Sequence, residues 1–235
     1  MNDLTLAVVI PTWNEAEALP AMLKSLQLQS QPAEQILVVD GNSSDATTAI
    51  VKAAGVGLLI ANGRGRGHQI AAGLRQLNQA IILVGHADML FPVTALERIR
   101  QYLRDHPDCP GGCLGHRFAS TRWQYRLIEW FDRQRAMRGL SYGDQAQFFR
   151  RECLAQVGGF PDQPIMEDFE LSHRLMALGR PAYLNQLVTV SPRRFERQGI
   201  GKTLYANWRI RRQYHQRGNS APMILPSEYY DEQQK

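Results

Sequence analysis

Short apolar runs alternate with segments of helical spacing along the first hundred residues of the chain. Four of the runs have the length of buried strands: residues 6–10, 35–39, 57–61 and 80–84. Three intervening segments repeat their apolar residues as amphipathic helices do: residues 15–29, 44–54 and 69–78. This alternation predicts an α/β fold, in which a mostly parallel central sheet is covered by helices on both faces.

Each predicted strand is followed by polar, glycine-bearing or charged residues. The four strings are P-T-W-N-E from Pro11, which closes the first run, D-G-N-S-S-D from Asp40, N-G-R-G-R-G-H from Asn62 and G-H-A-D from Gly85. Turn chemistry explains any one of these strings on its own. Because ligands of parallel sheets bind outside the carboxyl ends of the strands, four polar ends together indicate one binding site.

The pattern changes beyond residue 100. Residues 107–115 are rich in turn-forming types, and residues 122–138 alternate large apolar side chains with arginines. Residues 141–149 then begin a separate stretch that runs from polar to apolar. The end of the chain, residues 223–235, has the composition of a loosely ordered tail.

The composition is that of an ordinary globular protein, with 44% hydrophobic and 21% charged residues in 235. No apolar run approaches the roughly 20 residues that span a bilayer, and the N-terminus lacks a signal-peptide pattern. We therefore expect a cytoplasmic protein. Three cysteines, an odd number, do not indicate a disulfide framework in a chain of this length.

The net charge of +5 and the pI near 9.3 permit an anionic partner. Basic residues concentrate between Arg193 and Arg217, where Glu196 is the one acid. This segment either faces phosphate groups or an anionic membrane, or forms a solvated helix face. Few aromatic residues interleave its arginines, so we expect no nucleic-acid partner.

Several strings of the chain resemble those of the family 2 glycosyltransferases, and their order and spacing make the resemblance specific. They are V-V-I-P-T-W-N-E from Val8, V-V-D-G-N-S-S-D-A-T from Val38, the arginine-glycine loop at 63–68, H-A-D at 86–88, G-D-Q-A-Q-F-F-R-R from Gly143 and M-E-D-F-E-L from Met166. The resemblance runs from about Leu6 to Arg212. It is strongest to a short bacterial branch with H-A-D in place of D-x-D.

The resemblance implies the GT-A fold of nucleotide-diphospho-sugar transferases. It makes residues 1–100 the nucleotide-sugar-binding half, and residues 101–222 the acceptor-binding and catalytic half of the same domain. It also implies inverting transfer of a sugar, expected to be uridine-linked, from a nucleoside diphosphate to an acceptor hydroxyl. The alternative is a non-catalytic nucleotide-sugar-binding protein of the same fold, suggested by His86 and by Ala71, which replaces an asparagine of the branch.

The resemblance assigns one set of residues to donor binding: Pro11, Thr12, Glu15, Asp40, Arg64, Arg66, Gln69, Asp144, Arg193, Arg194 and Arg197. Asp40 can accept hydrogen bonds from a ribose or a base edge, although an Asx turn with Gly41 also explains it. Arg64 and Arg66 can pair with diphosphate oxygens. Their loop does not follow the G-x-G-x-x-G dinucleotide pattern, and His68 replaces the second arginine of the branch.

His86 and Asp88 are the expected metal ligands. Side chains two residues apart on an extended chain point to the same side and can hold one ion. A carboxylate with an imidazole suits Mn²⁺ or Mg²⁺, and the imidazole favours Mn²⁺. Two alternatives stay open: the pair marks a strand end that reaches water, or His86 bonds a donor hydroxyl.

Glu167 and Asp168 open a predicted helix that carries Leu171, Leu175 and Leu178. Acids at a helix start are favoured by the helix dipole alone. The E-D string of the family supplies its general base, so the resemblance implies that Asp168 takes the acceptor proton, with Glu167 in reserve.

The acceptor side is less specified by the sequence. We expect a hydroxyl-bearing acceptor, with a lipid-linked one as an option, and contact of residues 122–138 with the inner face of a membrane. A run of soft ligands also raises a zinc site: His106, Cys109, Cys113 and His116. Its spacing is not that of a standard finger, and residues 110–112 instead predict a turn into a strand with buried cysteines.

Overall fold

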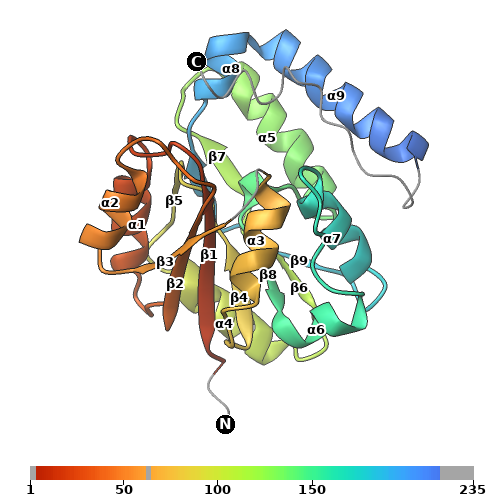
Figure 1. Cartoon of the computed structure of the whole chain (residues 1–235). Coiled ribbons are helices and arrows are strands. Elements are labelled where there is room, and N and C mark those ends of the chain that lie inside the picture. The colour runs from red at the N-terminus through yellow and green to blue at the C-terminus, as the bar shows by residue number, and fades with distance from the viewer. Residues whose placement is uncertain (1–3, 62–64, 218–235) are drawn as a thin grey trace.

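The structure, a computed structural model, describes residues 4–61 and 65–217 (Figure 1). Its centre is a sheet of seven strands in the order β3-β2-β1-β4-β8-β6-β9. The bounds are β1 (Leu6–Thr12), β2 (Gln35–Asp40), β3 (Gly57–Ile60), β4 (Ile81–Val84), β6 (Gly111–Cys113), β8 (Gln147–Arg150) and β9 (Ala182–Tyr183). Of these strands β8 alone runs against the others, so the prediction of a mostly parallel sheet is confirmed.

The first strand, β1, lies between β2 and β4. In the register of the sheet, Thr12 lies opposite Asp40 of β2 and Val9 lies opposite Val84 of β4. The prediction that Pro11 ends this strand is wrong, because β1 continues to Thr12. Pairing with β4 stops at Val9, so the proline, which cannot donate a backbone hydrogen bond, lies where β1 has β2 as its remaining neighbour.

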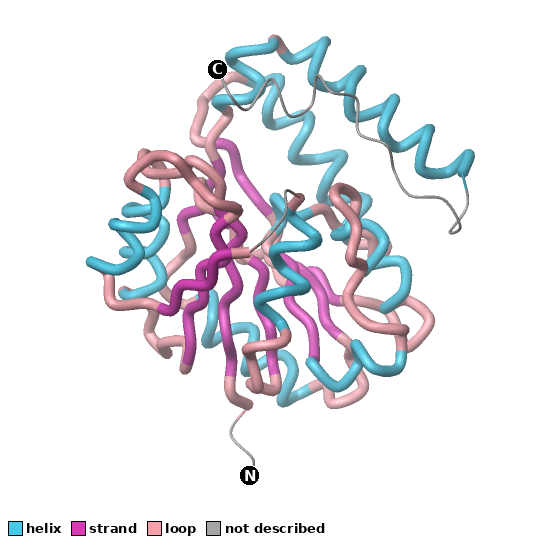
Figure 2. Tube along the Cα trace, in the orientation of Figure 1, coloured by secondary structure: helices cyan, strands magenta, loops and turns pink. Residues whose placement is uncertain are grey.

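Helices cover both faces of the sheet, as predicted (Figure 2). Side chains alternate along β1, so Leu6 and Val8 join one apolar cluster while Ala7 and Val9 join another. The first cluster includes residues of α1 (Leu19–Gln27), α2 (Thr47–Ala53) and α4 (Ala95–Asp105). The second includes residues of α3 (Arg66–Leu74), α6 (Arg151–Gln156) and α7 (Glu167–Leu175). Fully burying each aliphatic side chain contributes about 1.5–3 kcal/mol, so these two clusters fix the layers.

A second sheet of three strands, in the order β5-β10-β7, joins β5 (Met89–Leu90), β10 (Val188–Val190) and β7 (His116–Phe118). Beyond the carboxyl edge of the parallel strands lie α5 (Trp123–Ala136), α8 (Arg193–Gln198) and α9 (Ile200–Arg217) (Figure 1). Phe195 of α8 packs edge-on against Phe118 of β7 and Tyr125 of α5. Phe169 of α7 likewise packs edge-on against Tyr214 of α9. These aromatic contacts anchor α8 to β7 and α5, and α9 to α7.

The two predicted halves share one sheet, since β6, β8 and β9 extend the sheet that the first half begins. The expected boundary at residue 100 falls within α4. The strand predicted after residue 110 is present as β6 with Cys113 buried, but Gly111 and Gly112 belong to the strand instead of the expected turn, and Cys109 is half-buried. The expected tail at 223–235 lies outside the described residues. Over the described part of the chain, no helix combines the length and hydrophobicity that crossing a membrane requires.

Candidate active site

The ends of β1 and β2 are joined through the carboxylate of Asp40, which is fully buried. Its Oδ2 accepts hydrogen bonds from the hydroxyls of Thr12, at 3.0 Å, and Ser43, at 2.6 Å, while its Oδ1 accepts the Ser43 amide at 2.7 Å. Asp40 thus organises the turn after β2. Its contact with a nucleoside stays a prediction.

Gln69 of α3 fastens the same two strand ends. Its buried Nε2 donates to the backbone carbonyls of Thr12, at 2.7 Å, and Val39, at 3.0 Å. Gly41 permits this contact, because a Cβ there would lie 2.9 Å from the same nitrogen. The described contacts of this amide nitrogen are therefore structural, and donor binding by Gln69 stays a prediction.

Glu15, Asp88 and Arg193 form a charged cluster at this edge. Arg193 Nη2 of α8 lies 2.6 Å from Glu15 Oε2, although the two residues are 178 apart in sequence. Burial raises the pKa of Glu15 and of Asp88, and the positive charge of Arg193 opposes both shifts. The charge of Arg66 also acts on Asp88, so this end of the sheet gathers two carboxylates and two guanidiniums, a set that can hold a cation and an anionic diphosphate together.

Asp168 lies at the start of α7 and is held by backbone amides. Its Oδ2 accepts the amide of Gly143 at 2.6 Å, and its Oδ1 accepts the amide of Phe169 at 2.6 Å. Gly143 belongs to the short 3-10 turn η1 (Gly143–Gln145). Arg66 Nη2, from the start of α3, lies 3.8 Å from Asp168 Oδ2. The carboxylate is therefore fixed in orientation by η1 and α7.

Glu167 precedes this carboxylate and is also buried. Its Oε1 lies 3.2 Å from Arg66 Nε. Burial raises the pKa of Glu167 to about 7; the charge of Arg66 opposes the shift and that of Asp168 adds to it. Near neutral pH this carboxyl is therefore divided between its protonated and ionised forms.

The imidazole of His86 lies on the Asp168 side of the site. A Cβ on Gly143 would lie 2.5 Å from His86 Nε2 and 3.1 Å from Asp168 Oδ2, so only glycine fits between them. Burial, with a smaller contribution from Arg66, lowers the pKa of His86 to about 3. Its Nε2 is buried and has no hydrogen-bond partner within the described segments, which leaves a neutral imidazole able to bind a ligand.

His86 and Asp88 do not share an extended segment, so the premise of the same-side prediction is wrong. After β4 ends at Val84 the chain turns at residues 87–88, where the Met89 amide donates to the His86 carbonyl at 3.1 Å. Strand alternation therefore does not apply to the pair. Metal ligation by each residue stays a prediction.

The structure brings most of the predicted charged residues to one edge: Glu15, Arg66, His86, Asp88, Glu167, Asp168 and Arg193. Asp144 turns elsewhere, since its carboxylate lies in a separate cluster with His116 and Asp132. Arg197 is exposed on α8, Arg194 is half-buried, and Arg64 lies outside the described residues. Sequence reasoning missed the Gly143 amide, although the G-D-Q string pointed to its neighbour Asp144.

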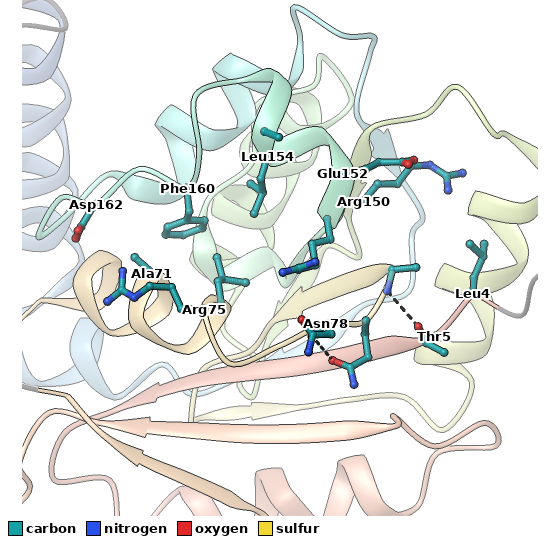
Figure 3. A pocket seen from close by; sticks show the side chains of 15 residues that line it. Leu4, Thr5, Ala71, Arg75, Asn78, Arg150, Glu152, Leu154, Phe160 and Asp162 are labelled. Carbon is teal, nitrogen blue, oxygen red and sulfur yellow. Dashed lines mark hydrogen bonds between the residues drawn. The ribbon is translucent and has the colours of Figure 1, made fainter.

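A pocket lies at the opposite edge of the sheet and is not part of this cluster (Figure 3). Its lining includes Thr5, which precedes β1, and Ala80, which precedes β4, together with Phe160. The Ala80 amide donates to Thr5 Oγ1 at 3.1 Å across it. Because these residues stand at the starts of the parallel strands, we do not place a substrate there.

Two solved structures share this architecture. One is S. aureus TarS 1–349 in complex with UDP-GlcNAc, with a TM-score of 0.64, 18% identity, and coverage of 80% of this chain and 58% of that one. The other is the mannosyltransferase PcManGT from Pyrobaculum calidifontis in complex with GDP-Man and Mn²⁺, with a TM-score of 0.63, 23% identity, and coverage of 88% and 60%. The protein therefore has the GT-A fold of glycosyltransferases, as predicted.

Residues 7–157 match the model of glycosyl transferase family 2, and the chain belongs to this family. Among curated relatives are undecaprenyl-phosphate 4-deoxy-4-formamido-L-arabinose transferases from Yersinia enterocolitica, 29% identical, and Serratia proteamaculans, 31% identical. Each match extends over 161 residues, which are 63% of this chain and 49% of the relative. The chain thus spans about half the length of the curated relatives it matches.

Proposed function

We propose that this protein is a metal-dependent, inverting glycosyltransferase that moves a sugar from a nucleoside diphosphate donor to an acceptor hydroxyl. The observation that carries the proposal is the convergence of two acidic centres at one sheet edge, Asp88 beside Glu15 and Asp168 beside Gly143. Arg66 connects them, since its charge acts on Asp88 and its guanidinium lies 3.8 Å from Asp168.

The donor is proposed to bind along the ends of β1, β2 and β4. Pro11, Thr12 and Asp40 would line the nucleoside pocket, and Arg66 and Arg193 would face the diphosphate. The two solved structures of similar fold are complexes with UDP-GlcNAc and with GDP-Man, which supports a donor of this chemical class. Among the two nucleosides we propose uridine.

Asp88 is the proposed ligand for Mn²⁺ or Mg²⁺, because its buried carboxylate lies beside Glu15 after the end of β4, and carboxylate oxygens suit these ions. The buried Nε2 of His86 has no hydrogen-bond partner in the described chain, and because the ring lies on the Asp168 side we propose that it bonds a donor hydroxyl instead of the ion. When bound, such an ion neutralises charge on the departing diphosphate. Mn²⁺ in the PcManGT complex supports this assignment.

Asp168 is proposed to take the proton of the acceptor hydroxyl. The amides of Gly143 and Phe169 hold its two oxygens, so its remaining lone pairs have a defined direction. Inversion requires the acceptor to attack from the side opposite the leaving group. The proposal therefore places the acceptor next to Asp168, under α5 and α9, and the diphosphate next to Asp88.

A donor-release assay tests the proposal. Purified protein is incubated with a panel of nucleotide sugars and with Mn²⁺, and the nucleoside diphosphate released is measured against a sample without metal. We expect slow, Mn²⁺-dependent release from at least one UDP-sugar. Binding of donors without release, across the panel and several hydroxyl acceptors, would instead support the non-catalytic alternative.

A membrane-bound acceptor is the second part of the proposal. Helix α5 exposes Trp123, Leu127, Trp130 and Phe131, at positions that share one helix face, and Trp123 is 69% exposed. Exposed arginines accompany them on α5 and α9. Aromatic side chains with basic neighbours suit the surface of an anionic bilayer. The undecaprenyl phosphate in the names of the curated relatives supports a lipid-linked acceptor.

Co-sedimentation with vesicles tests this membrane contact. At low salt the protein should sediment with vesicles that contain anionic phospholipid. Replacing Trp130 of α5 and the exposed Trp208 of α9 together, Trp130→Ala with Trp208→Ala, should reduce the bound fraction several-fold. Leu28→Ala is the matched control, because Leu28 is 58% exposed but follows α1, away from α5. Absence of sedimentation at low salt would rule the contact out, and a dimer in solution would assign the apolar face to a second copy.

A further inference from the structure

His116, Asp132 and Asp144 form a cluster that the proposed reaction does not use; His116 is buried and the two aspartates are half-buried. His116 comes from β7, Asp132 from α5 and Asp144 from η1. One ligand atom of each lies within 4.8 Å of those of the other two. Three consecutive elements of the chain therefore bring one imidazole and two carboxylates together.

Three buried polar atoms of this cluster have no hydrogen-bond partner among the described residues. His116 is 4% exposed, and neither of its ring nitrogens has a hydrogen-bond partner within the described chain. Asp144 Oδ1 is buried and also has none there. Leaving a buried polar group unsatisfied is costly, so these atoms point to a ligand that completes them.

The spacing favours a shared ion over a direct hydrogen bond. His116 Nε2 lies 3.7 Å from Asp132 Oδ2, which is too long for a hydrogen bond. Two ligand atoms at about 2.1 Å from one ion can be up to roughly 4.2 Å apart. The His116–Asp132 distance falls within that span, and all three ligand atoms lie within 4.8 Å of one another, so binding of an ion would draw them closer together.

The cation Arg135 does not fill the position. Its Nη1 lies 2.6 Å from Asp132 Oδ1, the oxygen that faces away from the histidine contact. Its guanidinium also lies over the ring of Tyr142, at 4.0 Å from the ring centre. The charge of Arg135 also acts on Asp144, but its contact with Asp132 is to Oδ1, which leaves Oδ2 of Asp132 facing His116.

We propose that His116, Asp132 and Asp144 bind a divalent transition-metal ion, such as Zn²⁺ or Mn²⁺, at a second site separate from Asp88. One imidazole and two carboxylates are a common donor set for these ions. The ion fastens η1 to α5 and β7. Since η1 carries the Gly143 amide that holds Asp168, this second site also positions the proposed base.

Isothermal titration of the Asp88→Asn variant with Zn²⁺ and with Mn²⁺ tests this site, because the variant removes the proposed donor-metal ligand. We expect one ion to bind to Asp88→Asn, and binding to weaken at least tenfold when His116→Gln or Asp132→Asn is added. Asp144→Asn serves as a further variant if one of these does not fold.

Thermal unfolding gives an independent readout that does not depend on catalysis. A ligand that binds only the folded state raises the midpoint, so Zn²⁺ should raise the midpoint of Asp88→Asn and leave that of the double variants unchanged. No binding of either ion by Asp88→Asn, or equal binding by the double variants, would overturn the proposal. If this metal binding is retained but the unchanged protein transfers no sugar, the proposed function is wrong and the second metal site stands.

Discussion

Asp168→Asn is expected to lower kcat for sugar transfer by about 10²–10⁴-fold, the usual contribution of a general base. Each carboxylate oxygen of Asp168 accepts a backbone amide at 2.6 Å, whereas the asparagine side chain has a single oxygen to accept them. One amide therefore loses its acceptor, and we expect a stability loss of about 1–3 kcal/mol as well. Donor binding should stay near that of the unchanged protein.

The matched control is Glu167→Gln, one residue away on the same helix. Its carboxyl is occupied by Arg66 at 3.2 Å and is partly protonated near neutral pH, so its loss should lower kcat far less. Steady-state kinetics at saturating donor, with unfolding curves for both variants, makes the comparison. A larger loss in Glu167→Gln than in Asp168→Asn would transfer the role of base to Glu167.

Asp88→Asn is expected to remove the response to Mn²⁺ and to lower transfer by about 10²–10³-fold. Stabilisation of a leaving diphosphate by a metal is worth several kcal/mol, and each 1.36 kcal/mol corresponds to a tenfold change in rate. The measurement is the Mn²⁺ dependence of nucleoside diphosphate release. An unchanged half-saturating Mn²⁺ concentration in this variant would contradict the assignment of Asp88.

His86→Gln is the companion variant for this experiment. Because the His86 ring lies against Gly143 and faces Asp168, we expect its loss to reduce kcat with little change in the half-saturating Mn²⁺ concentration. A shift as large as that of Asp88→Asn would make His86 a metal ligand, and would show that the turn at 87–88 brings both side chains to one ion.

Local periodicity predicted the first four strands and the edge at which their polar ends meet. It placed the start of the third helix at residue 69, whereas α3 begins at Arg66. The extra turn depends on Gly67, where a Cβ would lie 2.0 Å from the Gln163 carbonyl oxygen. A contact between residues about a hundred positions apart is not contained in the local pattern.

The candidate site was predictable in its residue types but not in its pairings. The Glu15–Arg193 ion pair joins the first strand end to α8, and nothing in the spacing of either string specifies it. The cluster at His116 was missed for a similar reason. In the sequence Asp132 lies among the arginines and aromatic residues of α5. Only the packing of β7 and η1 beside α5 brings it next to His116 and Asp144.

The reversed direction of β8 has a mechanical consequence for the enzyme that we propose. This strand starts at the edge where β1, β2 and β4 end, and Gln147 at its start donates to the Asp168 carbonyl at 2.8 Å and to Ser172 Oγ at 2.7 Å. The proposed base is therefore held by β8 and α7, whereas Asp88, the proposed metal ligand, follows β4. A shift of α7 relative to β4 would therefore change the distance between the proposed base and the proposed metal ligand.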